Sequence, residues 1–223
     1  MKLSMSTSRY SKMAKPLTST LCSIIVLFAS IMANAAVGLT PLEQDILTET
    51  NVARTQPQVY AAKLEQLRQD FTGKALRIPE KKLTLLTTEG LSALEEAICF
   101  LKKQVPLSPL ANSPILTLAA RDHARDQAFT GVMGHVGSDG SQITDRVNRH
   151  GRWQRVVGEN ISYGPDSAAR VIMQLIINDG MPTRSHRENI FNADYHWLGV
   201  ACGQHPRYSQ MCVMTYAYRL EPF

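Results

Sequence analysis

Three short segments of the sequence place side chains that could carry chemistry beside glycines and loop residues. They are Gly134-His135, Gly158-Glu159-Asn160-Ile161 and Arg184-Ser185-His186-Arg187-Glu188-Asn189-Ile190. Two imidazoles and a carboxylate brought together could hold a divalent ion such as zinc, with water in the open position. They could equally form a hydrogen-bonded cluster that ties loops together without a metal. Composition alone favours this second interpretation.

Several other familiar sites are absent from the sequence. It contains no phosphate loop, no GxGxxG, no GxSxG elbow and no HExxH. No serine or cysteine nucleophile with a paired base is recognisable, so hydrolysis would have to depend on a metal. The segment Gly137-Ser138-Asp139-Gly140-Ser141 lacks the ligand spacing of a calcium loop. It is better explained as a turn that leads into a helix capped by Ser141.

The charge of the chain is concentrated at its beginning. Its 223 residues carry a formal net charge of +5, from 24 Lys and Arg against 19 Asp and Glu. Four of the basic residues fall within residues 1–35, which hold no acidic residue, so 20 basic residues remain against 19 acidic ones. This balance excludes the electrostatic argument for a nucleic-acid partner. The length favours one domain, with or without a processed segment.

Residues 1–35 have the three parts of a secretory signal. A basic region over residues 2–15 precedes a mostly apolar run over residues 17–32, and Ala33-Asn34-Ala35 supplies the small-x-small cleavage pattern. The apolar run of about 16 residues is shorter than the ~20 that span a bilayer. We therefore expect a signal peptide and a mature protein that begins near Ala36, is secreted or periplasmic, and does not span the membrane.

Export permits a disulfide, because the compartments outside the cytoplasm are oxidising. Cys202 and Cys212 lie in two apolar, strand-like runs joined by a polar loop, so a bridge between neighbouring strands is predicted. Cys99 falls in a helical pattern and is expected to be a buried free thiol.

The elements that must position these residues are helices first and strands later. Helices are expected to start at Thr40-Pro41-Leu42-Glu43 (a capping box), near Pro57, at Thr88, and at Ser113-Pro114 with an end at Gly131. Residues 74–82 resemble a basic, turn-prone connection. Residues 197–202 and 211–218 are continuous apolar runs, typical of strands covered on both faces. The predicted fold is α+β, a three-layer α/β/α sandwich with a central antiparallel sheet.

An ordered set of motifs gives the chain a resemblance to a known family. The set is Asn51-Val52-Ala53-Arg54, Leu118-Ala119-Ala120-Arg121-Asp122-His123-Ala124, Gly134-His135, Gly158-Glu159-Asn160-Ile161, His186-Arg187-Glu188-Asn189-Ile190 and Leu198-Gly199-Val200. It resembles the CAP superfamily (cysteine-rich secretory proteins, antigen 5 and pathogenesis-related proteins, the SCP domain), in a bacterial-type exported form. The likeness covers most of residues 40–219. It implies a CAP domain over residues 36–223, with an extra helical segment around residues 73–109.

The resemblance implies an α/β/α sandwich with a central cavity lined by two histidines and two acids. Carried over by motif, His135 is the first histidine, Glu159 the first acid and His186 the second histidine. Family members usually carry the second acid about one helical turn after a Trp. In this chain a leucine replaces that Trp, and the acid is either Asp179 or lost to Asn178.

Other polar residues near these motifs have simpler interpretations. Ser185 and Glu188 form a capping box pattern around His186, so Glu188 is expected to be a cap and not a ligand. His123, on an alanine-rich helical face, is expected to be a core histidine with its hydrogen bonds satisfied. Asn160 is expected to bind backbone groups. Arg54 is expected to pair with a carboxylate.

Three functions remain open at this level. The leading one is an exported, non-enzymatic binding or interaction protein whose partner is a lipid, a sterol or another extracellular protein. Its cavity would hold a divalent metal, zinc being favoured, on His135, His186 and Glu159, or lie near the lipid or sterol site. The second is a metal-dependent, protease-like hydrolase that uses the same cavity. The third is a structural envelope protein. A fold by itself does not decide among them.

Overall fold

The computed structural model describes residues 38–223, and the predicted signal peptide lies outside them. Among the described residues, no helix has the length and apolar character needed to cross a bilayer. The helices are α2 (Pro41–Thr55), α3 (Pro57–Glu65), α4 (Leu91–Lys103), α5 (Pro114–Thr130), α6 (Ile143–Asn148), α7 (Ala168–Ile177) and α8 (Ser185–Ile190), with 3-10 turns η1 (Gln66–Asp70) and η2 (Pro79–Lys81). The strands are β1 (Phe71–Thr72), β2 (Ala75–Ile78), β3 (Leu83–Leu86), β4 (Ala111–Asn112), β5 (Arg152–Tyr163), β6 (Trp197–His205) and β7 (Ser209–Glu221).

A four-stranded sheet with the order β4-β6-β7-β5 lies at the centre of the fold. Its three long strands are antiparallel, with β7 between β6 and β5. The two-residue strand β4 adds a short parallel pairing at the edge beside β6. Residues 211–217 of β7 are all buried, as expected for a strand that is covered on both faces.

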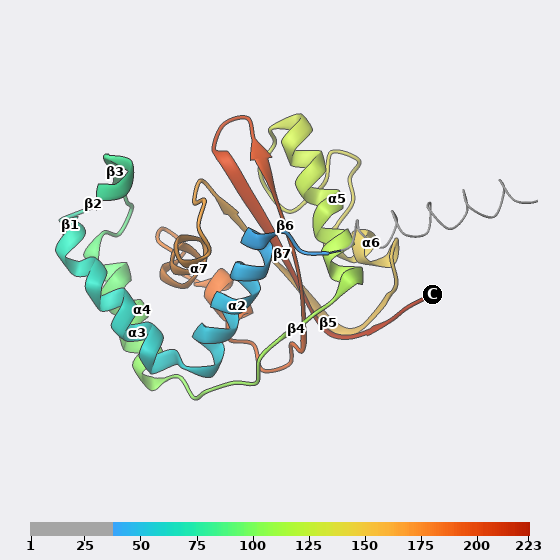
Figure 1. The fold of residues 1–223 in the computed structure, drawn as a ribbon, viewed down its shortest axis with the longest axis horizontal. Helices are drawn as coiled ribbons and strands as arrows, with labels where there is room; N and C mark the ends of the chain where they lie inside the picture. The colour runs from blue at the N-terminus through green and yellow to red at the C-terminus, as the bar shows by residue number, and fades with distance from the viewer. Residues whose placement is uncertain (1–37) are drawn as a thin grey trace, which may run out of the picture. The chain divides into compact units, whose positions relative to one another are not determined.

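Helices cover both faces of this sheet (Figure 1). α5 and α6 pack on one face, whereas α2, α7 and α8 lie on the other, with α3 and α4 packed beside them. A large apolar cluster fills the α2 and α7 side, and two smaller clusters lie beneath α5 and α6. The predicted α+β class and three-layer α/β/α sandwich are confirmed.

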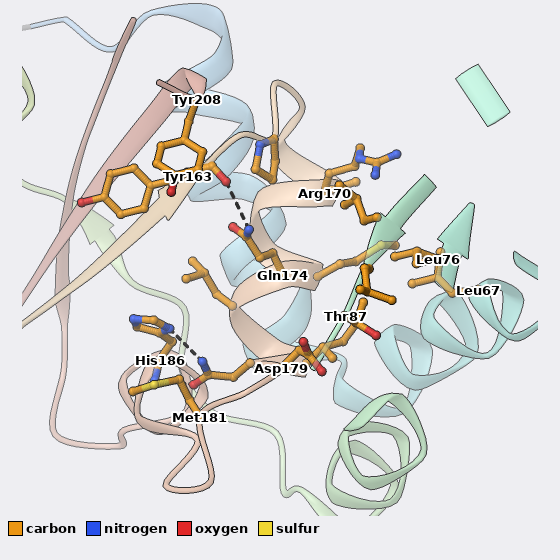
Figure 2. Close-up of a pocket in the computed structure, with 18 of the residues that line it drawn as sticks. Leu67, Leu76, Thr87, Tyr163, Arg170, Gln174, Asp179, Met181, His186 and Tyr208 are labelled. Carbon is orange, nitrogen blue, oxygen red and sulfur yellow. Dashed lines mark hydrogen bonds between the residues drawn. The ribbon is translucent and has the colours of Figure 1, made fainter. Parts of the chain in front are cut away.

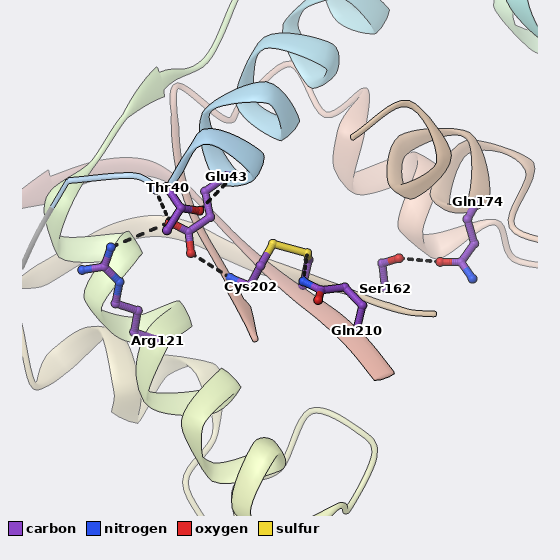
Figure 3. Close-up of a disulfide and its surroundings, with 8 residues drawn as sticks. Thr40, Glu43, Arg121, Ser162, Gln174, Cys202 and Gln210 are labelled. Carbon is purple, nitrogen blue, oxygen red and sulfur yellow. Dashed lines mark hydrogen bonds and ion pairs between the residues drawn. A yellow bond between two sulfur atoms is a disulfide. The ribbon is translucent and has the colours of Figure 1, made fainter. Parts of the chain in front are cut away.

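The first helix begins where its capping box was predicted. The Thr40 hydroxyl accepts from the Glu43 backbone N–H at 3.4 Å, and Glu43 Oε2 accepts from the Thr40 N–H at 2.8 Å. The second oxygen of Glu43 accepts from the Cys202 N–H at 2.8 Å, and Arg121 lies 3.8 Å from the same carboxylate (Figure 3). The start of α2 is therefore tied to β6.

A disulfide joins Cys202 on β6 to Cys212 on β7, which face each other directly in the strand register (Figure 3). The third cysteine of the described residues, Cys99, differs from its prediction because its side chain is exposed on α4. The buried stripe of this helix passes through Leu94, Ala97, Ile98 and Leu101. Cys99 directly follows Ile98. Because each residue of a helix is rotated by about 100° from the one before it, the Cys99 side chain points away from the core.

The helix α5 also lies where it was predicted, and it sets the position of the loop that follows. The Ser113 hydroxyl accepts from the Leu116 N–H, and Gly131 ends the helix in the left-handed conformation. Gly199 on β6 allows a very close approach of α5, because a Cβ there would lie 2.1 Å from the Leu116 carbonyl carbon. This contact fixes α5 on the sheet and so places the Gly134-His135 loop.

The segment between α3 and α4 differs from its prediction. Residues 74–82 are not a simple connection, because β1, β2 and β3 form a separate three-stranded antiparallel sheet. The extra segment around residues 73–109 thus holds strands as well as α4. The helix α4 starts at Leu91. Its N-cap is Gly90, with a φ of 70°, and not Thr88 as predicted. Lysines in the segment concealed the short alternation of apolar residues in β2.

Arg54 is also placed differently from its prediction. Its guanidinium pairs with no carboxylate within residues 38–223. It donates to the backbone carbonyls of Ser108, Ile190, Asn192 and Tyr195, at 2.6 to 3.4 Å. These carbonyls belong to chain segments that a local pattern cannot relate to α2, which is why the sequence did not indicate them. Arg54 therefore joins the end of α2 to the end of α8.

Candidate functional site

The first histidine and the first acid of the predicted cluster are in contact. His135 Nδ1, on the loop after α5, lies 2.9 Å from Oε1 of Glu159 on β5. The Glu159 side chain is only 3 % exposed, whereas that of His135 is 52 % exposed. Since a carboxylate only accepts hydrogen bonds, the His135 Nδ1 must carry a proton. Its other ring nitrogen, Nε2, holds the lone pair when the imidazole is neutral.

A buried arginine completes this part of the cluster. Arg146 Nη2 donates to both oxygens of Glu159, at 3.1 and 2.9 Å, and its side chain is 2 % exposed. The same guanidinium donates to the carbonyls of Ser141 (2.8 Å) and His135 (3.1 Å). It therefore holds the carboxylate and the His135 backbone in one network.

Arg146 was not predicted from the sequence, because it belongs to no motif and lies on the short helix α6. That helix does not begin at Ser141 as predicted. Gln142 is its N-cap, and Asp145 completes the capping box. Because the helix begins after Gln142, the Arg146 side chain faces inward toward Glu159. The signal that could have indicated Arg146 is its position inside a short helix next to the loop that carries His135.

The second histidine contacts Asn178, the residue that follows α7. The Asn178 Oδ1 accepts from the His186 backbone N–H at 3.0 Å, and its Nδ2 lies 2.9 Å from His186 Nδ1 (Figure 2). The backbone bond orients the amide, so the amide nitrogen donates and His186 Nδ1 accepts. Neutral His186 then carries its proton on Nε2. The predicted Ser185–Glu188 capping box does not form, since α8 has no side-chain cap.

The surroundings of His186 favour its neutral form. Burial lowers the pKa of His186 below its ordinary value, and the nearby His135 lowers this pKa further. His186 is therefore neutral at pH 7.

Asp179 bonds to the turn before α4, whereas the side chain that bonds to His186 is that of Asn178. The two carboxylate oxygens of Asp179 accept from the backbone N–H groups of Thr88 (2.6 Å) and Glu89 (2.8 Å). Glu89 in turn accepts from the Gly180 N–H and from Arg184, and these bonds lower the pKa of Glu89 to about 2. These bonds fasten the turn before α4 to the loop after α7.

Two polar networks support the segments that carry the histidines. Asn160 Nδ2 donates to the His186 carbonyl at 2.9 Å, which agrees with its predicted backbone-binding role. Tyr163 accepts from the Gly134 N–H at 3.1 Å, and His123 Nε2 lies 2.8 Å from the Gly134 carbonyl. His123 is fully buried as predicted, but within residues 38–223 its Nδ1 has no hydrogen-bond partner.

Both histidines lie in the wall of a cavity of about 730 Å³, and Figure 2 shows His186 there. One side of it is formed by η1 and the β1–β3 sheet, and the other by α7 together with β5 and the loop after α5. Asn178 and Asp179 also line it. Most of the lining is apolar and includes Leu67, Phe71, Leu76, Leu85, Leu86, Met133, Ile161, Met173, Leu175, Ile177 and Met181. The sequence predicted the histidines but not the β1–β3 wall opposite α7.

The arrangement of these donors can be compared with what zinc requires. Glu159 already accepts from Arg146 and His135 through its oxygens, and His186 presents an N–H at Nε2. Zinc needs lone pairs directed at one point. Within residues 38–223, no group of three or more His, Cys, Asp or Glu side chains is arranged to hold a metal ion. The residues expected to bind zinc therefore do not fit it in this arrangement.

The solved structures that resemble this chain include the following three. An outer surface protein from Borrelia burgdorferi is 18% identical, with a TM-score of 0.45, covering 66% of this chain and 99% of that one. An extracellular SCP-domain protein from Bacillus anthracis is 17% identical (TM-score 0.39; 64% and 44% covered). A cysteine-rich secretory protein from Staphylococcus aureus is 16% identical (TM-score 0.39; 58% and 38% covered). This chain thus spans less than half of the last two proteins.

The sequence matches a family model, whereas no curated protein matches it. The family model for CAP, the cysteine-rich secretory protein family, matches residues 47–216. That range includes α5, the His135 and His186 segments, and most of the central sheet. The chain belongs to the CAP family of cysteine-rich secretory proteins.

Proposed function

We propose that this protein is an exported CAP-domain binding protein whose cavity takes an apolar, lipid-type ligand. The observation that carries the proposal is the apolar cavity of about 730 Å³ between α7 and the β1–β3 sheet. Its volume lies within the range of about 300–1,000 Å³ typical of small-molecule sites. Each Å² of apolar ligand surface that it buries contributes about 25 cal/mol to binding.

The rim of the cavity supports the same function. Leu85, Leu86, Met133 and Met181 line the cavity and are also exposed to solvent. Single exposed apolar residues are common on protein surfaces, but a group of them around one opening marks a binding site. A ligand with an acyl chain or a fused apolar ring system would cover these side chains and remove them from water.

This proposal accounts for more of the structure than the two alternatives do. A metal-dependent hydrolase needs a free carboxylate to activate water, but Glu159 is paired with Arg146, and Asp179 accepts from the backbone of residues 88 and 89. A purely structural role would explain the buried Arg146–Glu159 pair but would leave the apolar cavity without a use. Ligand binding uses both the cavity and the polar groups in its wall.

Replacing Leu86 with Asp should weaken binding of a neutral fluorescent acyl probe by roughly tenfold, equivalent to ~1.4 kcal/mol. The new carboxylate would have to lose water against the acyl chain. Leu86 is 85 % exposed, so the substitution should leave the fold intact. The measurement is a fluorescence titration of the exported protein and the variant.

Val105→Asp is the matched control, because Val105 is 71 % exposed and lies outside the cavity lining. The control should bind the probe as tightly as the unmodified protein. Equal weakening in both variants, or no probe binding by the unmodified protein, would argue against a ligand in this cavity.

Export is the other part of the proposed function. The basic and apolar regions within residues 1–35, followed by Ala33-Asn34-Ala35, support cleavage after residue 35. N-terminal sequencing of the protein recovered from the envelope or culture fraction should therefore find a chain that starts near Ala36. A chain that keeps Met1 and fractionates with membranes would contradict this expectation.

A further inference from the structure

The two histidines of the cavity have opposite hydrogen-bonding partners at Nδ1. His135 meets the carboxylate of Glu159, which accepts, whereas His186 meets the amide nitrogen of Asn178, which donates. In the neutral rings, Nε2 of His135 is therefore an acceptor and Nε2 of His186 is a donor. Within residues 38–223, neither Nε2 atom has a hydrogen-bond partner.

This difference decides what the pair can bind. An imidazole that ligates a metal donates its other N–H to a carboxylate, a carbonyl or water, which leaves the ligating nitrogen free of a proton. His135 satisfies that condition through Glu159. His186 does not, because moving its proton to Nδ1 would bring two donors face to face across the 2.9 Å contact with Asn178.

A donor on His186 and an acceptor on His135, both in the wall of one apolar cavity, match a hydroxyl group, which can both donate and accept a hydrogen bond. A carboxylate or phosphate ester would supply acceptors only and would leave His135 Nε2 without a donor. The guanidinium of Arg146, which could have attracted an anion, is already occupied by Glu159.

We propose that Asn178 fixes His186 as a donor, so that the polar end of the cavity recognises the hydroxyl of an apolar alcohol and does not take zinc. His186 Nε2–H donates to the hydroxyl oxygen, and His135 Nε2 accepts the hydroxyl proton. The hydroxyl part rests on the proposed function, because the rest of the alcohol fills the apolar cavity. The tautomer of His186 stands independently of it.

The metal arm of the test compares the unmodified protein with Asn178→Asp by calorimetric titration with zinc alone at pH 7.5. Asp is nearly isosteric with Asn. One of its oxygens can still accept from the His186 N–H, while the other would accept from Nδ1–H and free Nε2. The variant should gain zinc affinity by roughly 10–100-fold, the usual effect of such a partner. The double variant Asn178→Asp/His186→Ala should lose this gain. Zinc binding by the unmodified protein as tight as that of Asn178→Asp would overturn the proposal.

The tautomer can be observed without any substitution. Nitrogen-15 NMR of the histidine rings should show His186 of the unmodified protein protonated at Nε2 and His135 protonated at Nδ1. A proton on Nδ1 of His186 would overturn the proposal, whether or not the Asn178→Asp variant folds.

The ligand arm compares decanol with decyl methyl ether, which has nearly the same apolar body but no hydroxyl proton. Decanol should displace the neutral acyl probe roughly tenfold more effectively, and His135→Ala should reduce that preference, because His135 Nε2 is the atom that accepts the hydroxyl proton. Equal displacement by the two compounds, while the probe itself binds, would overturn the hydroxyl ligand and leave the proposed function standing. Failure of the probe to bind at all would instead count against the proposed function, and the NMR result would still report on the tautomer.

Discussion

Replacing Arg146 with Met should lower the free energy of unfolding by about 3–5 kcal/mol, as expected when a buried ion pair loses one partner. The side chains of Arg146 and Glu159 are 2 % and 3 % exposed, so water cannot readily replace the guanidinium. The carbonyls of Ser141 and His135 would lose a charged donor at the same time. Urea unfolding followed by circular dichroism gives the difference directly.

Two variants separate burial from the loss of an ion pair as such. Arg68→Met removes an arginine that pairs with Glu95 at the surface at 2.6 Å, a shorter distance than the 2.9 Å of Arg146 and Glu159, and it should change stability far less. The double variant Arg146→Met/Glu159→Leu should recover much of the loss, because no unpaired buried charge remains. A single Arg146→Met variant as stable as the unmodified protein would show that the pair does not hold the His135 loop.

The second large effect is expected at Arg54, the residue that joins α2 to the segment after α8. Arg54→Met should cost about 3–5 kcal/mol, because charged donors are worth about 1.5–3 kcal/mol each and several carbonyls would lose theirs together. The carbonyls of Ile190 and Asn192 lie 2.6 and 2.9 Å from Nη1, and that of Ser108 lies 3.0 Å from Nε. The Arg54 residue is 1 % exposed. Thermal and urea unfolding should agree on the loss.

Arg155→Met is the control for this prediction. Arg155 lies 3.7 Å from Asp194, and both side chains are more than half exposed, so its removal should change stability by less than about 1 kcal/mol. Because Ile190 ends α8, Arg54→Met should also increase amide hydrogen exchange in the segment that carries His186. Unchanged exchange there would show that Arg54 supports only the fold and not the site.

The features that the sequence predicted well depend on neighbouring residues. The capping box of Thr40 and Glu43, the Ser113 cap and the Gly131 end of α5 all involve contacts within one helical turn. The two long apolar runs of the C-terminal third predicted β6 and β7, because strands buried on both faces need apolar residues throughout.

The features that it did not predict depend on contacts between distant segments. Arg54 binds carbonyls more than fifty residues away, and Arg146 reaches Glu159 from another element. The β1–β3 wall of the cavity was hidden because its strands are short and mixed with lysines and arginines. No local pattern describes a residue whose partners come from elsewhere in the chain.

The choice between Asn178 and Asp179 shows this division most clearly. The sequence by itself determined the family, the layers of the fold, and the segments that carry His135, Glu159 and His186. Only the tertiary structure decided that Asn178 lies against His186, while Asp179 binds the turn before α4. The reason is that α7 ends in a left-handed residue at Asn178, with φ of 51°, so adjacent side chains point to different parts of the molecule. Where a helix stops depends on what packs around its last turn, and a single sequence does not contain that information in any local pattern.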